Sequence, residues 1–468
     1  MPNRNKDSAQ KMKRLLAKKM AYTGGFILLL LASFLYGAFS VVHQTLPFRI
    51  VGYLNAQKNK MFPVAEGIKK GSWHIARSDL PNQGITDEQR ESLAKVTALP
   101  YLKGYYSAPD KKNVTVYNKE AAYHGLNLVV SGHGTEAILI DMEGKVLHSW
   151  QKDFENIWPG PSAPNLDELY KTFWRRARLF DNGDLLAIFR DYGLVKLDKN
   201  SNLLWAYKSR CHHDLFVAED QRIYVLSRER RNNPRLQLES WSAKNPYLED
   251  LIVILNSEGV EQKRINVVDC FLNSEFAPIL EHMKVRENIL HANAIEMLDG
   301  TLVDKFPMFE KGHILISLRE IHTIAIIDLE QEKVTWALNG MWKYQHEPSL
   351  LKNGNVLVFD NRGNNGKSKI IEVNPLNQTI AWTYKGTPAQ EFFSKTAGTT
   401  ERLPNGNTLI TESNNGRAFE VTPEGKIVWE FFNPYRAGEN NELIAALYDV
   451  VRYDQNQFDW LALNARSE

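Results

Sequence analysis

The stretch His346–Asn361, HEPSLLKNGNVLVFDN, decides the fold of this chain. It predicts two short strands that meet at the pair Asn353-Gly354, because both residues of such a pair tolerate the positive φ of a tight hairpin turn. Two further strands are expected at Lys369–Val373 and Thr379–Tyr384. Four short antiparallel strands within about 45 residues are typical of one blade of a β-propeller.

The same unit recurs along the chain with its turn and a closing Trp. The turns read DNG from residue 181, LDG from 298, KNG from 352 and PNG from 404, and the Trp residues are Trp150, Trp205, Trp336, Trp382 and Trp429. The last three Trp are 46 and 47 residues apart, which fits a four-stranded blade with its loops. A large ring on the fourth strand fills the wedge between twisted sheets, so we expect packing between blades rather than ligand stacking.

Six such units predict an all-β chain, a six-bladed β-propeller of four-stranded blades over residues 113–435. Six or seven blades close a ring without a long exposed edge. Val114–Tyr117 is a possible innermost strand of the first blade. Three segments interrupt the repeat, of which the first and third are expected to be partly helical: Phe154–Trp174, Arg228–Asp250 and Phe271–Leu290. Residues 436–468 have a helix-like pattern and are predicted to pack on the ring as a C-terminal helical tail.

The N-terminal part of the chain predicts a membrane anchor. Residues 1–20 are basic, and Tyr22–Val42 carries no charge, which is long enough for a transmembrane helix over 21–43. The basic flank places the N-terminus in the cytoplasm and the propeller on the periplasmic or extracytoplasmic side of a single-pass protein. A cleaved signal peptide is the alternative, but no clear small-x-small site follows. Residues 44–112 are expected to be a connector with a short helix at Thr86–Leu102.

Composition excludes several classes of protein. The chain of 468 residues has 57 Lys and Arg against 55 Asp and Glu, so a net charge of +2 gives no bulk field for nucleic acid. Two Cys, Cys211 and Cys270, exclude a disulfide scaffold and a Cys-rich zinc site. They form either one disulfide in an exported domain or two free buried thiols.

Histidines stand where several units begin. The first strands of propeller blades line the centre, so residues at their starts converge from distant parts of the sequence. Those positions hold His212-His213, His291 and His346, although the chain has only 12 His, and Arg319 and His322 follow the second strand of the fourth unit. Three interpretations remain from the residues alone: a metal site built from His, nucleophilic catalysis on a sulfuryl or phosphoryl group, and a binding scaffold.

The motifs CHHDL, LHANAIE, ISLR and QHEPSLLKNGNVLVFDN, followed by TERLPNGNTLITES and EGKIVWEF, resemble the arylsulfate sulfotransferase family over roughly residues 130–440. The resemblance implies a six-bladed propeller, often periplasmic. It implies an enzyme that moves a sulfuryl group from an aryl sulfate to a phenol through a sulfohistidine, with no nucleotide donor, cofactor or metal. The Cys spacing, the anchor and the long segment between His291 and Arg319 depart from the family pattern.

The resemblance also implies roles for individual residues. His346 would be the nucleophile, and His291 and Arg319 would hold the sulfuryl oxygens. His213 would complete the pocket and serve the acid–base step at the phenol oxygen. His212 is its rival, because strand alternation lets only one of two neighbours face the centre. Asn293 and His322 are the further candidates for substrate binding.

Other functions remain open at this level. The main alternative is a non-catalytic propeller that acts as an interaction or assembly subunit of a membrane complex, and a homo-oligomer is equally compatible. A third is a quinoprotein-like or metal-dependent propeller enzyme, which the repeated Gly-x-x-x-Trp pattern suggests.

Overall fold

The computed structural model describes residues 33, 36, 70–75, 110–160, 166–232, 246–283, 287–388, 390–438, 441 and 443–464. The predicted anchor, apart from residues 33 and 36, and the predicted helix at Thr86–Leu102 lie outside these residues. Within the described part of the chain, no helix has the length and apolar character needed to cross a membrane. All the sheets belong to one compact unit, Ile68–Glu468.

Most of the described residues form six sheets of four or five antiparallel strands. We number these sheets by their order in the chain. The first three contain β28 (Leu447–Tyr453), β3 (Leu126–Ser131), β4 (Glu136–Ile140) and β5 (Val146–Gln151); β6 (Arg176–Leu179), β7 (Leu185–Phe189), β8 (Gly193–Leu197) and β9 (Leu203–Lys208); and β10 (Leu215–Val217), β11 (Ile223–Arg231), β12 (Tyr247–Leu255) and β13 (Glu261–Asn266).

The last three sheets contain β14 (Ala292–Met297), β15 (Ile314–Leu318), β16 (Thr323–Asp328) and β17 (Lys333–Asn339); β18 (His346–Leu350), β19 (Val356–Asn364), β20 (Lys367–Val373) and β21 (Ile380–Tyr384); and β22 (Thr399–Arg402), β23 (Thr408–Glu412), β24 (Arg417–Val421), β25 (Ile427–Phe432) and β2 (Asn113–Tyr117). Within each sheet, neighbours in the sequence pair with one another except where the two ends of the chain join it. The all-β, four-stranded repeat predicted from the sequence is therefore confirmed.

The two ends of the chain each add a strand to a distant sheet, and both differ from the prediction. β2 pairs with β25, as the outermost strand of the sixth sheet, and is not the innermost strand of the first. That inner place belongs to β28, which pairs with β3. The predicted C-terminal helical tail is thus wrong: of the residues described after 435, Asp459–Asn464 (α5) are helical, whereas Leu447–Tyr453 (β28) form a strand of the first sheet. The open edge of β3 would leave buried backbone groups unpaired, which outweighs the helix propensity of this segment.

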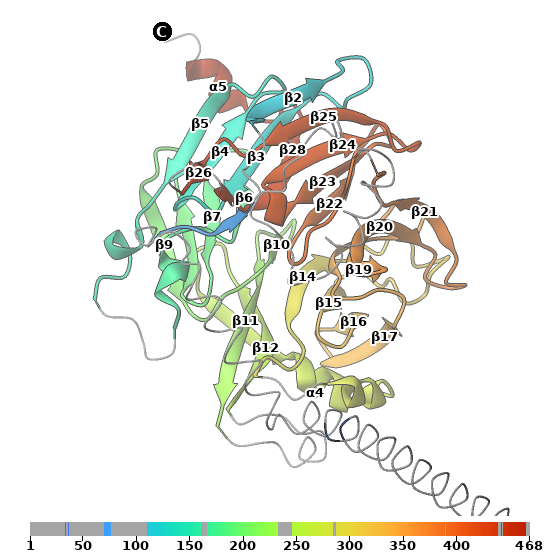
Figure 1. Cartoon of the computed structure of the whole chain (residues 1–468). Coiled ribbons are helices and arrows are strands. Elements are labelled where there is room, and N and C mark those ends of the chain that lie inside the picture. The colour runs from blue at the N-terminus through green and yellow to red at the C-terminus, as the bar shows by residue number, and fades with distance from the viewer. Residues whose placement is uncertain are drawn as a thin grey trace, which may run out of the picture. The chain divides into compact units, whose positions relative to one another are not determined.

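The innermost strands of neighbouring sheets contact one another. β10 contacts β14, β14 contacts β18, β18 contacts β22, β22 contacts β28, and β28 contacts β6. Figure 1 shows the sheets set around a common centre, with β6, β10, β14 and β22 toward it. The starts of these inner strands therefore come together, as the positions of the histidines require.

The apolar core lies between neighbouring sheets, and the closing Trp residues tie them together. The indole N–H of Trp150 donates to Gly183 O at 3.0 Å, and that of Trp429 donates to Met142 O at 3.0 Å. Each acceptor is in a turn of the next sheet. Trp205 and Trp382 make the same kind of bond, so the predicted packing role of these Trp residues is confirmed.

The hairpin turns use glycine differently from the prediction. In the turn between β18 and β19, Gly354 has φ +87° while Asn353 does not take a positive φ. Gly354 N–H donates to Leu351 O at 2.8 Å, and Leu351 N–H donates to Asn355 O at 2.9 Å. A side chain at Gly354 would also meet the Phe306 ring at 2.0 Å. Glycine is required here by one left-handed residue and a close approach, not by a two-residue turn.

Buried charges connect the inner strands. The guanidinium of Arg176, in β6, donates to Asp214 at 2.7 Å and to Asp449 at 2.9 Å, and it also pairs with Glu347. These carboxylates come from the start of β10, from β28 and from β18. One buried arginine therefore fixes several inner strands, and it anchors the residue that follows His346.

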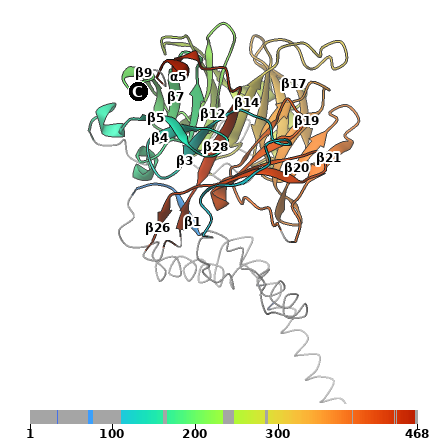
Figure 2. The ribbon, with the colours of Figure 1, turned by 90° about the horizontal axis from the view of Figure 1, so that it is seen from above.

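The insertions and the small sheet complete the described structure. The interruptions contain short helices, as predicted for the first and third: η1 (Phe154–Asn156), η2 (Glu168–Lys171), α4 (Val267–Leu272) and η4 (Ala277–His282), and η5 (Ser413–Asn415) follows β23. β1 (Trp73–Ile75), β27 (Leu443–Ala445) and β26 (Arg436–Ala437) form a three-stranded sheet, and Figure 2 shows β1 and β26 to one side of the larger sheets. Cys211 and Cys270 are both free and buried.

Candidate active site

The predicted site residues lie at the starts of the inner strands of three successive sheets. His212 and His213 precede β10, His291 precedes β14, and His346 is the first residue of β18. All four are buried, with between 1% and 7% of their surface exposed. Because β14 contacts both β10 and β18, the fold brings these segments together from positions far apart in the sequence.

The ring of His346 is held firmly at one nitrogen. Nδ1 lies 2.7 Å from Asn361 Oδ1 and 3.1 Å from Tyr344 O. The orientation of the Asn361 amide is defined, because its Nδ2 donates to Ser394 O at 2.9 Å and to Ala397 O at 2.7 Å. Both partners of Nδ1 are thus acceptors, so Nδ1 carries the proton and Nε2 keeps its lone pair.

The electrostatic environment keeps this ring neutral. Burial, the charge of Arg319 and, more weakly, that of Arg175 lower the pKa of His346 to about 3, although the bond to Asn361 acts in the opposite direction. Among the described residues, nothing hydrogen-bonds to Nε2. His346 therefore presents an unprotonated nitrogen at neutral pH, which is the form that can act as a nucleophile.

The other three histidines form a hydrogen-bonded chain. His291 Nε2 lies 3.2 Å from His213 Nε2, and His213 Nδ1 lies 2.9 Å from His212 Nδ1. His212 Nε2 ends the chain 3.0 Å from Ser227 O and 3.3 Å from Asp250 Oδ1. His213 is the one of the two neighbours that reaches His291, whereas His212 points toward Asp250.

The donors in this chain follow from its two ends. Ser227 O can only accept, so His212 Nε2 carries a proton and its Nδ1 accepts from His213 Nδ1–H. His213 Nε2 then accepts from His291 Nε2–H, and Asn288 Nδ2 donates to His291 Nδ1 at 2.8 Å. All three rings are neutral in this arrangement. Burial also lowers the pKa of His212, and lowers those of His213 and His291 well below the ordinary value.

Arg319 is linked to both groups of histidines. Its charge lowers the pKa of both His346 and His291, and its backbone N–H donates to His291 O at 3.1 Å. Its side chain pairs with Glu320 and lies 5.8 Å from the centre of the Tyr344 ring. The charge of Arg319 thus acts on both histidines. No hydrogen bond between described residues joins His346 directly to His213 or His291.

Asn293 and His322 occupy supporting positions. Asn293 Nδ2 donates to Gln345 O at 2.8 Å, next to His346, while its buried Oδ1 has no hydrogen-bond partner. His322 Nδ1 accepts from Tyr344 N at 3.2 Å, and Tyr344 O in turn accepts from His346. In this structure, His322 therefore contacts the residue that holds the His346 ring.

Several of these positions have an unusual backbone. His213, His291, His322 and Tyr344 have φ values from +52° to +58°. Residues other than Gly take such angles at a cost of about 1–3 kcal/mol each, and they cluster where function requires an imposed geometry. The strained residues coincide with the hydrogen-bonded histidines and their supports.

Arg175 lies outside the pattern of histidines in the sequence, but its position in the repeat identifies it. Arg175 stands as many residues before Gly183 as His346 stands before Gly354, so it occupies the same place in the second unit. It is 5% exposed, and its charge lowers the pKa of both His213 and His346. A comparison restricted to His could not find it. Arg190, after β7, and Tyr448, in β28, are further neighbours that the repeat alone does not predict.

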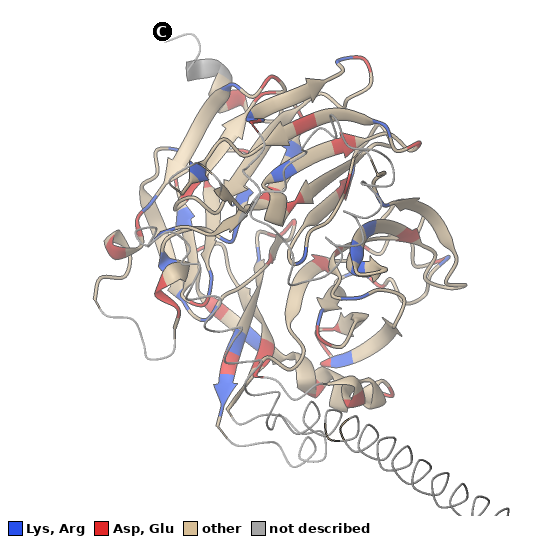
Figure 3. Ribbon diagram, viewed as in Figure 1, with Lys and Arg blue, Asp and Glu red and all other residues tan. Residues whose placement is uncertain are grey.

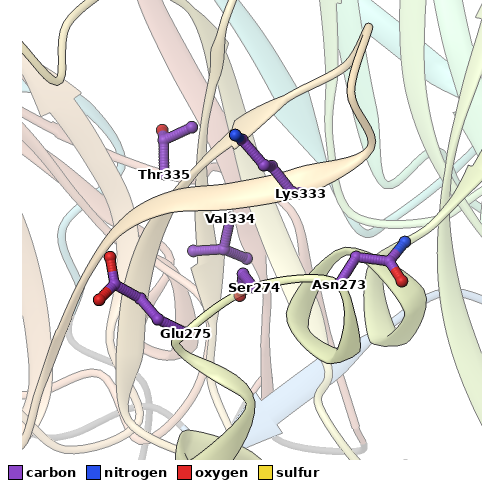
Figure 4. Close-up of a pocket in the computed structure, with 6 residues that line it drawn as sticks. All are labelled: Asn273, Ser274, Glu275, Lys333, Val334 and Thr335. Atoms are coloured by element: carbon purple, nitrogen blue, oxygen red, sulfur yellow. The ribbon is translucent and has the colours of Figure 1, made fainter.

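Among the described residues, the sheets carry charges of both signs. Figure 3 shows acidic and basic residues interleaved over the sheets. In the described part of the chain, no group of three or more His, Cys, Asp and Glu is placed to hold a metal ion. A pocket of about 350 Å³ lies beside β17 and after α4 (Figure 4), lined by Asn273, Ser274, Glu275, Lys333, Val334 and Thr335. None of the histidines or arginines discussed above lines it.

Comparison with solved structures finds similar folds at low sequence identity. A protein of unknown function from Bacteroides caccae is 13% identical, with a TM-score of 0.45, over 70% of this chain and 98% of that one. A streptogramin B lyase is 11% identical, with a TM-score of 0.39, over 73% and 93%. The β-propeller domain of Myceliophteria thermophila Cps50 (Swd1) is 11% identical, with a TM-score of 0.39, over 72% and 100%. At these scores the similarities carry no argument about function.

Sequence comparison is more informative. No curated protein matches the chain. A family model described as Arylsulfotransferase (ASST) matches residues 176–434, which is more than half of the chain and includes every predicted site residue. This chain therefore belongs to the arylsulfotransferase family, and it is a sulfotransferase-like enzyme whose family implies aryl sulfates and phenols as substrates.

Proposed function

We propose that this chain is a membrane-anchored sulfotransferase that moves a sulfuryl group from an aryl sulfate to a phenol without a nucleotide donor, through a sulfohistidine at His346. The observation that carries the proposal is the state of the His346 ring. Nδ1–H is held by Asn361 and Tyr344, while Nε2 is neutral and has no partner among the described residues. A positioned lone pair of this kind is what attack on sulfur requires.

In the first half of the reaction, His346 Nε2 attacks the sulfur of the donor. The N–S bond forms, the bond between sulfur and the aryl oxygen breaks, and the phenol leaves with the electron pair and takes up a proton. The charge of Arg319 acts on His346 more strongly than that of Arg175, and we assign it to stabilise the negative charge on the sulfuryl oxygens. His291 and Asn293 are the further groups that hold those oxygens.

In the second half, the acceptor phenol loses its proton, its oxygen attacks sulfur, and the N–S bond to His346 breaks. The chain of His291, His213 and His212 is suited to both proton movements, because each ring has one nitrogen that donates and one that accepts. A proton given to one end shifts the tautomer of each ring in turn. We assign the phenol oxygen to His213, whose Nε2 would exchange its bond with His291 for the phenol proton.

The architecture that accompanies this function is a closed six-bladed propeller behind a membrane anchor. The contacts between successive inner strands and the two terminal strands, β2 and β28, support closure of the ring. The uncharged stretch Tyr22–Val42 after a basic segment supports an anchor, with the propeller outside the cytoplasm. Protease treatment of cells tests this orientation. A propeller that stays protected until the cytoplasmic membrane itself is permeabilised would contradict it.

The test of the activity uses the full chain in detergent, with 4-nitrophenyl sulfate labelled with ³⁵S as donor and phenol as acceptor. We expect release of nitrophenolate together with labelled phenyl sulfate, and, without acceptor, an acid-labile label on His346. A His346→Ala variant, checked for folding by its thermal unfolding, serves as the control. Absence of turnover and of the adduct with the intact protein would instead favour a propeller that has kept the family fold for interaction or assembly.

A further inference from the structure

The region beside the histidines carries more arginines than its carboxylates can pair. Asp191 is bound by Arg228, at 2.6 Å from Nε and through a second short bond. Arg190 and Arg210 each approach Asp191 only to 4.0 Å, and the buried Nε of each has no hydrogen-bond partner. Arg175 has no hydrogen bond or ion pair for its guanidinium within the described residues, although it is 5% exposed. A buried guanidinium without an acceptor is costly unless an anion completes it.

Aromatic rings, not carboxylates, hold two of these arginines in place. The guanidinium of Arg175 lies 4.8 Å from the centre of the Tyr448 ring, and Tyr448 is stacked on Phe173 at 5.2 Å. Phe173 contacts Tyr170 edge to face at 6.2 Å, and Arg190 lies 4.4 Å from the Tyr170 ring. The series Arg175, Tyr448, Phe173, Tyr170 and Arg190 is continuous. A guanidinium stacked on a ring keeps its in-plane N–H groups free for an anion.

This series lies next to the site without including Arg319. Arg175 directly precedes β6, the inner strand of the second sheet, whereas Arg319 follows β15 in the fourth. The charge of Arg175 acts on both His346 and His213, and that of Arg190 acts on both His213 and His291. Geometry agrees, because Arg176, the residue after Arg175, binds Asp214 and Glu347, which directly follow His213 and His346. Glu347 is the carboxylate that raises the pKa of Arg175, but it is already paired with Arg176.

We propose that Arg175 and Arg190, stacked on Tyr448 and Tyr170, form a second anion subsite that binds a carboxylate or sulfate group of the aromatic substrate, so that the preferred substrates carry an anionic group besides the transferred sulfate. The inference rests on the proposed function for its site, since Arg319 is assigned there to the transferred group. The half-buried rings of Tyr170 and Tyr448 suit the aromatic part of such a substrate. Two separated cationic groups select a dianion because a monoanion leaves one of them unpaired.

The test measures binding, which does not depend on turnover. Benzenesulfonate resembles the donor but cannot be transferred, and 4-sulfobenzoate differs from it by one carboxylate. Titration of the full chain by calorimetry is expected to show 4-sulfobenzoate binding at least tenfold more tightly. Arg175→Gln should weaken 4-sulfobenzoate at least tenfold and benzenesulfonate less than about twofold, and Arg190→Gln should act in the same direction. Arg222→Gln, an exposed arginine over Tyr224, is the matched control and should change neither ligand.

The possible results separate this inference from the proposed function. Equal weakening of both ligands by Arg175→Gln would place Arg175 on the transferred sulfate and overturn the second subsite, as would equal affinity of the intact protein for the two ligands. If Arg175→Gln does not fold, Arg175→Lys keeps the charge but not the stacked fork, and it should still reduce the preference for 4-sulfobenzoate. Selective binding of 4-sulfobenzoate by a protein that transfers no sulfate would uphold the subsite and overturn only the catalytic proposal.

Discussion

The fifth and sixth sheets are built on the same repeat, but their inner ends differ. Gly398 stands as many residues before the turn glycine Gly406 as His346 stands before Gly354. His346 is buried and held through its ring. At Gly398, φ is +105°, and any Cβ would come within 2.6 Å of the Phe359 ring. The sixth sheet therefore has no room for a side chain where the fifth carries its histidine.

The sixth sheet instead supports the histidine of the fifth. The loop before β22 supplies Ser394 O and Ala397 O, which fix the Asn361 amide that receives His346 Nδ1–H. The hydroxyl of Thr399, the first residue of β22, donates to Thr411 Oγ1 at 2.9 Å. The repeat thus sets the frame, and the positions where units differ assign one sheet to the reaction and its neighbour to positioning. Substitutions in the two sheets can separate the reaction from positioning.

The largest effect is expected from His346→Ala. Loss of a covalent nucleophile should lower kcat/KM for sulfuryl transfer by about 10⁴-fold or more, since the remaining groups can bind but not accept the sulfuryl group. Thr399→Ala, at the equivalent end of the sixth sheet, should stay within about threefold of the intact protein. Rates with 4-nitrophenyl sulfate measure both. Comparable losses in the two variants would mean that the two ends do not differ in function.

Asn361→Ala should have the next largest effect, because it frees His346 Nδ1 and removes the link to the loop before β22. We expect kcat to fall by about 10- to 100-fold, the usual cost of removing a group that orients a reacting histidine, with little change in the KM of the donor. Steady-state kinetics separate the two constants.

Asn361→Asp distinguishes positioning from folding. It keeps an acceptor for Nδ1–H, so it should retain more activity than Asn361→Ala. A carboxylate also favours the imidazolium, so the pKa of His346 should rise and the acid limb of the pH–rate profile should move to higher pH. Equal rates for the two variants, with no shift of the profile, would show that Asn361 serves only the fold.

The sequence predicts those parts of the fold whose signals are local, and it does not predict pairing between distant segments. The blade repeat was predictable because four of the six units hold the same turn glycine and five hold a closing Trp, which are local signals. Register at the chain ends was not, because the partner of β2 lies more than 300 residues away in sequence. The sequence of β28 has a helix-like pattern, and that it forms a strand follows only from its pairing with the edge of β3.

The candidate site was predictable only as far as residues share a place in the repeat. His213, His291 and His346 are found in this way, and so is Arg175 once residues other than His are considered. Asn361 carries no such mark: it is an ordinary Asn at the end of VLVFDN, and its importance depends on two carbonyl groups from the next sheet. Supporting residues of this kind are defined by three-dimensional contacts rather than by spacing.

The buried state of His346 should also make stability depend on pH. In the unfolded chain a His has a pKa near 6.5, whereas the pKa of His346 in the folded protein is about 3. Below pH 6.5 the unfolded state thus binds a proton that the folded state does not, and stability falls as pH falls. From pH 7 to pH 5 this residue alone should lower the free energy of unfolding by about 2 kcal/mol. His346→Gln should lose about that much less, as measured by urea unfolding at the two pH values; equal losses would mean that the ring is protonated in the folded protein.

The smallest effect concerns the frame itself, where the two sheets differ in how deeply their closing Trp is buried. Trp429 is fully buried and donates to Met142 O, so Trp429→Phe leaves a buried carbonyl without a partner and should cost about 1–2 kcal/mol of unfolding free energy. Trp382 donates to Pro423 O at an exposed position, where water can replace the indole, and Trp382→Phe should stay within about 0.5 kcal/mol. Neither change should alter kcat, because both rings lie on outer strands. A loss of activity in Trp429→Phe at unchanged stability would show that the junction between the sixth and first sheets influences the histidines, and the division between frame and site would then not hold.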